Sequence, residues 1–223
     1  MQLKNIRPLC SGFKRALDAG GALCILIFLM PMLCPVVWVL QRIQCPGPLF
    51  FRQIRVGLWG KPFWILKFRS LPVEECGAEF RFGSWLRRHG WDELPQCVNI
   101  LQGTMSLVGP RPLLAAEAAR GPVRIRRQRC GVLPGITGLA QIQGLRSNCP
   151  AVHAVRIRAD LAYVRGWTPL LDVRILLKSF RILFPFSGVP ERECVGGLDG
   201  KRLLRRGHPG PVRPPAWRGR GPG

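Results

Sequence analysis

A short segment of the chain, residues 87–112, has the sequence RRHGWDELPQCVNILQGTMSLVGPRP and places two adjacent carboxylates, Asp92 and Glu93, among basic side chains. An ionised Asp92 can attack phosphorus as a nucleophile. Glu93 can hold Mg²⁺, a hard cation that prefers carboxylate and phosphate oxygens. The neighbouring arginines can neutralise phosphates through bidentate contacts, and they are Arg87, Arg88 and Arg111. The segment therefore predicts phosphoryl chemistry centred on Asp92.

The same carboxylates also have a purely structural interpretation. Asp92 follows Gly90 and Trp91, so it can be the N-cap of a helix in which Pro95 is tolerated in the first turn. Glu93 would then complement the helix dipole. A helix N-terminus also attracts anions and keeps a carboxylate ionised. Both interpretations predict a helix that begins at Asp92, and the dipeptide alone does not separate them.

Composition limits the class of protein and its partners. The chain has 223 residues, 47% of them hydrophobic, which is enough for one domain with a core. Its formal charge of +22 predicts a polyanionic partner: nucleic acid, an anionic membrane surface or a phosphorylated substrate. No zinc-finger or RNP motif supports nucleic-acid binding. The 9 cysteines form no CxxC pair, which predicts reduced thiols rather than a disulfide framework or a zinc site.

An uncharged apolar stretch, residues 19–40, is long enough to enter a membrane. As a helix it would measure ~33 Å, about the thickness of a bilayer core. Pro31 and Pro35 lie near its middle, and each removes a helical hydrogen bond. Basic residues flank both ends, which predicts that both ends stay on the cytoplasmic side. A straight span and a helix broken at Met30–Pro31 both remain open from these residues alone.

Two short apolar runs after this stretch predict a β-hairpin. Residues 49–51 and 63–66 have strand character and are joined through glycines. Lys67 and Arg69 follow the second run, so this hairpin can face phosphate. The alternative is a solvated basic surface close to lipid headgroups.

Several sequence blocks together resemble the bacterial sugar transferase family, the monotopic phosphoglycosyl transferases. The resemblance runs from about Lys14 to Phe180. Its blocks, in the family's order, are KRALD, PGPLFFRQIRVG, LKFRS, LRRHGWDELPQCVNILQGTMSLVGPRP, LPGITGLAQIQG and DLAYVRGWTPLLDVRILL.

The resemblance implies a fold and a division of the chain. The expected fold class is α/β, mainly α, with a re-entrant helix–break–helix in the membrane, amphipathic surface helices and a small cytosolic catalytic domain. The break falls at Pro31. The expected parts are a basic segment 1–15, the re-entrant helix 16–41, a catalytic domain 42–190 and a disordered basic tail 191–223.

The resemblance also implies an activity. Family members move a sugar phosphate from a UDP-sugar to polyprenol phosphate and release UMP, at the cytoplasmic face of the bacterial inner membrane. Asp92 matches the nucleophile, Glu93 its acidic partner associated with Mg²⁺, and Pro110, Arg111 and Pro112 the loop that faces the nucleotide sugar. The implied partners are a UDP-sugar, polyprenol phosphate and an anionic membrane surface, with no nucleic acid. Self-association into a homo-oligomer stays open.

One feature departs from the family's pattern, and two matching aspartates have a simpler explanation. The stretch between Ser70 and Arg87 is several residues shorter than in typical members, which favours an alternative in which a catalytically impaired member serves as a membrane scaffold. Asp160 and Asp172 match acidic positions of the last block, but ion pairs with nearby arginines (Arg156, Arg158 or Arg174) explain them equally well.

Overall fold

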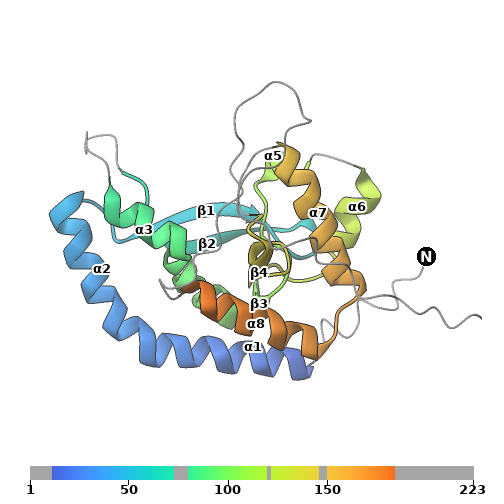
Figure 1. Ribbon diagram of the computed structural model, residues 1–223, viewed down its shortest axis with the longest axis horizontal. Coiled ribbons are helices and arrows are strands. Elements are labelled where there is room, and N and C mark those ends of the chain that lie inside the picture. The colour runs from blue at the N-terminus through green and yellow to red at the C-terminus, as the bar shows by residue number, and fades with distance from the viewer. Residues whose placement is uncertain (1–11, 73–79, 120–121, 146–149, 184–223) are drawn as a thin grey trace, which may run out of the picture. The chain divides into compact units, whose positions relative to one another are not determined.

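The fold begins with a long apolar helical run, seen in a computed structural model that describes residues 12–72, 80–119, 122–145 and 150–183. Helix α1 (Gly12–Cys24) continues through a π-helical turn, Ile25–Leu29, into α2 (Met30–Gln44). The Met30 N–H donates to the Ile25 carbonyl, five residues back. This wider turn directly precedes Pro31, which has no N–H to donate. Figure 1 shows that α1 and α2 run in different directions. A re-entrant path through a membrane stays a prediction.

This helical run is apolar and yet largely exposed. It extends over Gly12–Gln44, and only 17% of its most apolar window is buried. A core helix of a soluble protein would be mostly buried, so the exposed apolar surface is compatible with membrane association. The most exposed large side chains on it are Phe13, Phe28, Met32 and Ile43.

The predicted hairpin is confirmed and is longer than the sequence suggested. Strands β1 (Phe50–Val56) and β2 (Pro62–Phe68) pair in antiparallel register, with Ile54 opposite Trp64. A 3-10 turn, Leu58–Gly60, joins them. Asn99 bridges to β2, because its amide nitrogen donates to Trp64 O at 2.7 Å and its oxygen accepts from Leu66 N at 3.1 Å. This side chain therefore attaches the hairpin to the segment that carries the carboxylates.

A second pair of strands, which the sequence analysis did not predict, lies close to the PRP motif. Strands β3 (Ser106–Val108) and β4 (Gly135–Thr137) are parallel. Their ends approach so closely that a Cβ atom at Gly135 would lie 2.1 Å from the Gly109 nitrogen. Glycine is required here by the contact between two backbones.

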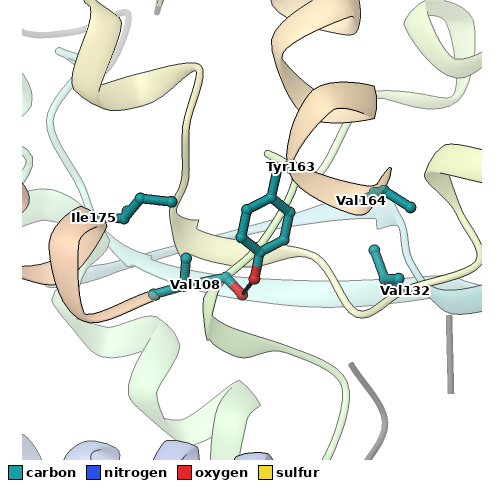
Figure 2. Close-up of a cluster of buried hydrophobic side chains, with 5 residues drawn as sticks. All are labelled: Val108, Val132, Tyr163, Val164 and Ile175. Atoms are coloured by element: carbon teal, nitrogen blue, oxygen red, sulfur yellow. Dashed lines mark hydrogen bonds between the residues drawn. The ribbon is translucent and has the colours of Figure 1, made fainter. Parts of the chain in front are cut away.

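Helices make up most of the remaining described residues, which confirms a mainly α-helical α/β fold with small sheets. They are α3 (Arg81–His89), α4 (Cys97–Leu101), α5 (Ala115–Ala118), α6 (Val123–Arg129), α7 (Pro150–Arg165) and α8 (Pro169–Leu183). Figure 2 shows one core cluster where β3, α7 and α8 meet, formed by Val108, Val132, Tyr163, Val164 and Ile175. The Tyr163 hydroxyl lies 3.0 Å from Val108 O inside this cluster.

A buried polar cluster, which we call the clasp, ties α1 to β3 and α8. Asp172 accepts from Lys14 Nζ at 2.6 Å and from Trp167 Nε1 at 3.0 Å, and its other oxygen lies 2.8 Å from the Tyr163 hydroxyl. Asp18 accepts from the Ser106 hydroxyl at 2.6 Å and from the Leu107 N–H at 3.1 Å. The start of the apolar helix is thereby fixed to the globular part of the chain.

The two family aspartates have the tethering role that their simpler explanation predicts, but with other partners. Asp172 pairs with Lys14, and Asp160 pairs with Arg129 at 2.8 Å. Lys14 and Arg129 were not among the predicted partners, because each lies far from its aspartate in the sequence.

The thiols are also only partly as predicted. Cys24, Cys34, Cys97 and Cys130 are free, whereas Cys45 is disulfide-bonded, contrary to the predicted reduced state.

The remaining predicted segments lie largely outside the described part of the chain. All described residues belong to one unit, Met1–Glu193. The predicted tail, 191–223, and most of the predicted basic segment, 1–15, lie outside them. The predicted boundaries between the segments stay predictions.

Candidate active site

The carboxylate pair lies on a 3-10 turn between two helices. Helix α3 ends at His89, and Gly90 adopts a left-handed conformation (φ 75°) that redirects the chain into the turn Trp91–Gln96. The predicted N-cap role of Asp92 is wrong: Gly90 is at the cap position and Asp92 lies inside the turn. The tight turn, followed by α4, presents both carboxylates to β2 and to the PRP loop.

Glu93 is held by two cations from different elements. Its Oε1 atom accepts from Lys67 Nζ at 2.7 Å, on β2, and from Arg111 Nη1 at 3.0 Å, in the loop after β3. The side chains of Lys67 and Glu93 are both 13% exposed, so these pairs are shielded from water. The structure therefore brings together three of the predicted site residues from segments that are distant in sequence.

Asp92 is buried but has no such neighbour. Its exposure is 7%, and among the described residues no cation lies within ion-pairing distance of its carboxylate. Burial, followed by repulsion from Glu93, raises the pKa of Asp92 to about 6, against the opposing charges of Lys67, Arg111 and Arg87. The ionised form still predominates at neutral pH. A carboxylate of raised pKa is also a stronger base, which suits a nucleophile.

The remaining predicted arginines occupy different surroundings. Arg87 and Arg88 are exposed in the last turn of α3, and the charge of Arg87 acts on Asp92. Arg69 is buried and donates to the carbonyls of Cys45 and Pro48, the latter at 2.9 Å. These bonds fix the connection between α2 and β1. A substrate contact by any of these three arginines stays a prediction.

One hollow in the described part of the chain lies away from this site. It has a volume of about 440 Å³ and lies between β2 and α4, where Trp64, Val98 and Gln102 line it. None of the predicted site residues is in its lining. The carboxylate pair is distinguished by its charge and burial.

The donor set limits what metal the site can hold. Among the described residues, no group of three or more His, Cys, Asp or Glu side chains converges. Mg²⁺ commonly binds through one or two carboxylates, with water and substrate phosphates completing its octahedron. Asp92 and Glu93 fit that incomplete kind of site. A closed all-protein metal site does not fit them.

Two contacts that hold the PRP loop were not predicted from the sequence. Arg129 donates to the carbonyl of Arg111, and Arg55 donates to the carbonyl of Pro112 at 3.4 Å. The acceptors are backbone atoms, so no pattern of side-chain types signalled these contacts.

Taken together, the features are those expected of a membrane-associated protein that handles phosphorylated groups: an exposed apolar helix, an excess of basic residues, and a carboxylate pair facing lysine and arginine. Comparison with known families agrees. The model of the family described as bacterial sugar transferase matches residues 9–185. The chain belongs to the bacterial sugar transferase family.

Characterised relatives share much of this chain. A UDP-glucose:undecaprenyl-phosphate glucose-1-phosphate transferase of Xanthomonas campestris pv. campestris is 41% identical over 187 residues, 76% of this chain and 38% of the relative. A transferase of the same name from Caulobacter vibrioides is 38% identical, over 74% of this chain and 67% of the relative. A third relative, from Aeromonas hydrophila, is named UDP-N-acetylgalactosamine-undecaprenyl-phosphate N-acetylgalactosaminephosphotransferase. It is 33% identical, over 81% of this chain and 46% of the relative. The chain thus spans less than half of the length of two of these three relatives.

Proposed function

We propose that the protein transfers a sugar 1-phosphate from a UDP-sugar to undecaprenyl phosphate, at the cytoplasmic face of a bacterial inner membrane, as the first membrane step of a lipid-linked glycan. The relatives' names support the substrate classes. The observation that carries the proposal is the asymmetry of the carboxylate pair: Glu93 is held by Lys67 and Arg111, and the buried Asp92 has no ion-pair partner among the described residues.

In the first step, a carboxylate oxygen of Asp92 forms a bond to the phosphorus that bears the sugar. The anhydride bond to the second phosphate breaks, and UMP leaves with the bonding electrons. Arg111 and Lys67 are placed to neutralise charge that develops on the phosphate oxygens. Mg²⁺, when bound through Glu93, would supply further charge neutralisation to the diphosphate.

In the second step, an oxygen of undecaprenyl phosphate attacks the same phosphorus. The bond to Asp92 breaks, its carboxylate is regenerated, and a polyprenol diphosphosugar is released. A covalent intermediate suits this pair of substrates, because both are anionic and they come from different phases. Each can visit the site in turn, so their mutual repulsion is avoided.

The clasp supports a site close to the membrane surface. It fixes the start of α1 to β3, and β3 leads directly into the PRP loop. A bent, re-entrant α1–α2 would keep both chain ends on the cytoplasmic side. Protease-accessible tags at Met1 and Gly223 should then lie on the same side of the membrane, and tags on opposite sides would contradict the re-entrant path.

The test is UMP release by purified protein given undecaprenyl phosphate and a panel of UDP-sugars that includes UDP-glucose and UDP-N-acetylgalactosamine. Asp92→Asn should lower the rate by at least about 10³-fold, because an amide cannot serve as the nucleophile. Arg127→Lys, an exposed change on α6, is the control for expression and folding. Unchanged turnover in Asp92→Asn would contradict the proposed nucleophile. No UMP release by the wild type from any donor would favour the scaffold alternative.

A further inference from the structure

The PRP loop has an unusual hydrogen-bonding requirement. Pro110 and Pro112 lack an N–H, so the loop cannot join a regular ladder and its carbonyls need donors from other elements. All three carbonyls have one. Pro110 O accepts from the Gly135 N–H at 3.0 Å, Arg111 O accepts from Arg129, and Pro112 O accepts from Arg55 at 3.4 Å. The backbone of the loop is therefore bound on the side of β1, β4 and α6.

The donor to Arg111 O is itself fixed in a buried ion pair. Arg129 is 5% exposed and its Nε donates to Asp160 Oδ2 at 2.8 Å. One guanidinium thus bridges a carboxylate of α7 and a carbonyl of the loop, a geometry that its planar set of donors allows and that a lysine ammonium does not reproduce. Burying two charges is costly, so such a pair is poor evidence of a gain in stability.

We propose that Arg129, held by Asp160, is a positioning residue that sets how Arg111 meets the phosphates of the nucleotide donor. This proposal rests on the proposed function for the identity of the donor. The bond to the Arg111 carbonyl fixes the backbone from which the Arg111 side chain reaches Glu93. It thereby fixes the position of the guanidinium that a diphosphate would contact. A misplacement of a site group by about 1 Å can lower the reaction rate by up to about 100-fold.

The test is a double-mutant cycle on the affinity for UDP, measured by calorimetry in the presence of Mg²⁺ on the full chain. Arg129→Lys retains the charge beside Asp160 and loses the bridging geometry. We expect it to weaken UDP binding about tenfold, within the range known for misplaced site groups. In an Arg111→Lys background the same substitution should have almost no further effect, because the residue through which it acts is already altered. Arg127→Lys, on the same helix and exposed, should leave the affinity unchanged.

Each outcome separates the positioning role from a structural one. A loss of UDP affinity that is equal in both backgrounds, or a folded Arg129→Lys protein with wild-type affinity, would overturn the proposal. If Arg129→Lys does not fold, Asp160→Asn tests the same link, and it should raise KM for the UDP-sugar more than it lowers kcat. A wild-type protein that binds UDP but releases no UMP would contradict the proposed function and leave the cycle interpretable.

Discussion

Two buried clusters of this molecule contain similar residue types but differ in whether their carboxylates are paired. In the clasp, the carboxylate oxygens of Asp18 and Asp172 all have hydrogen-bond partners, and a lysine, a tyrosine and a tryptophan converge on Asp172. At the site, Glu93 has two cations, whereas Asp92 is buried without an ion pair among the described residues. The clasp is a satisfied network, and the site retains one carboxylate that forms no ion pair with another described residue.

The difference indicates how to separate structure from chemistry in a chain with many charges. A satisfied buried network holds elements together and gains nothing from a ligand. A buried carboxylate kept without a partner costs free energy, which a protein tolerates where the group has a task. Substitutions in the two clusters should therefore change stability in opposite directions.

The largest change in stability is expected in the clasp. Asp172→Asn removes the nearer of two carboxylates that pair with Lys14, whose side chain is only 8% exposed, and leaves its buried ammonium group with Asp18 at 3.8 Å. Breaking a buried pair in this way costs about 3–5 kcal/mol, so thermal unfolding in detergent should occur at a markedly lower temperature. Arg174→Gln, an exposed change on the same helix, should have little effect. A wild-type melting temperature for Asp172→Asn would show that the clasp does not tether α1.

Asp92→Asn should have the opposite effect on stability. The folded-state pKa of Asp92 is raised to about 6, above its unfolded value near 4. The wild type therefore loses stability as the pH rises through that window, because the folded state binds the proton more tightly. The asparagine variant does not titrate and should be more stable at pH 7, by about 2 kcal/mol.

The comparison is made by thermal melts of both proteins across the pH range, in EDTA so that no divalent cation neutralises the pair. The stability difference should vanish below about pH 4, where the wild-type carboxyl is protonated in both states. A variant that is less stable than the wild type at neutral pH would show that Asp92 makes a stabilising contact, which would remove the contrast between the two clusters.

The smallest effect is expected for Tyr163→Phe. Only the hydroxyl is lost, 2.8 Å from Asp172 Oδ1 and 3.0 Å from Val108 O, while the ring remains in the core cluster. The free energy of unfolding should fall by about 1 kcal/mol, the net worth of a typical hydrogen bond. Denaturant titration measures this change. A loss as large as that of Asp172→Asn would place the strength of the clasp in the tyrosine rather than in the ion pair.

Local features of this fold were predictable from the sequence. The hairpin followed from strand runs separated by glycines, and the long apolar helix from its uncharged stretch. The residues left a straight span and a helix broken at Met30–Pro31 both open, and the structure has a continuous helical run with a π-helical turn at Ile25–Leu29. Lys67, Glu93 and Arg111 were each predicted to belong to one phosphate site, but the ion pairs that join Glu93 to the two cations were not predicted.

Contacts between distant segments were less predictable. The parallel pair β3–β4 consists of two three-residue strands, too short for a periodic signal. Asp172 was assigned nearby arginines, but its partner Lys14 lies 158 positions away. Arg129 and Arg55 donate to backbone carbonyls of the PRP loop. Every residue has such a carbonyl, so the residue types in the sequence did not indicate these contacts. The N-cap assigned to Asp92 failed because the left-handed Gly90 starts the turn two residues earlier.

The central claim is that Asp92 becomes covalently bonded to the phosphorus of the donor. Mass spectrometry of protein quenched during turnover with an accepted UDP-sugar tests it most directly. We expect the peptide that contains Asp92 to carry the added mass of a sugar phosphate before undecaprenyl phosphate is supplied, and to lose it afterwards. Product formation without that modified peptide at any time, or modification of another residue, would contradict the account.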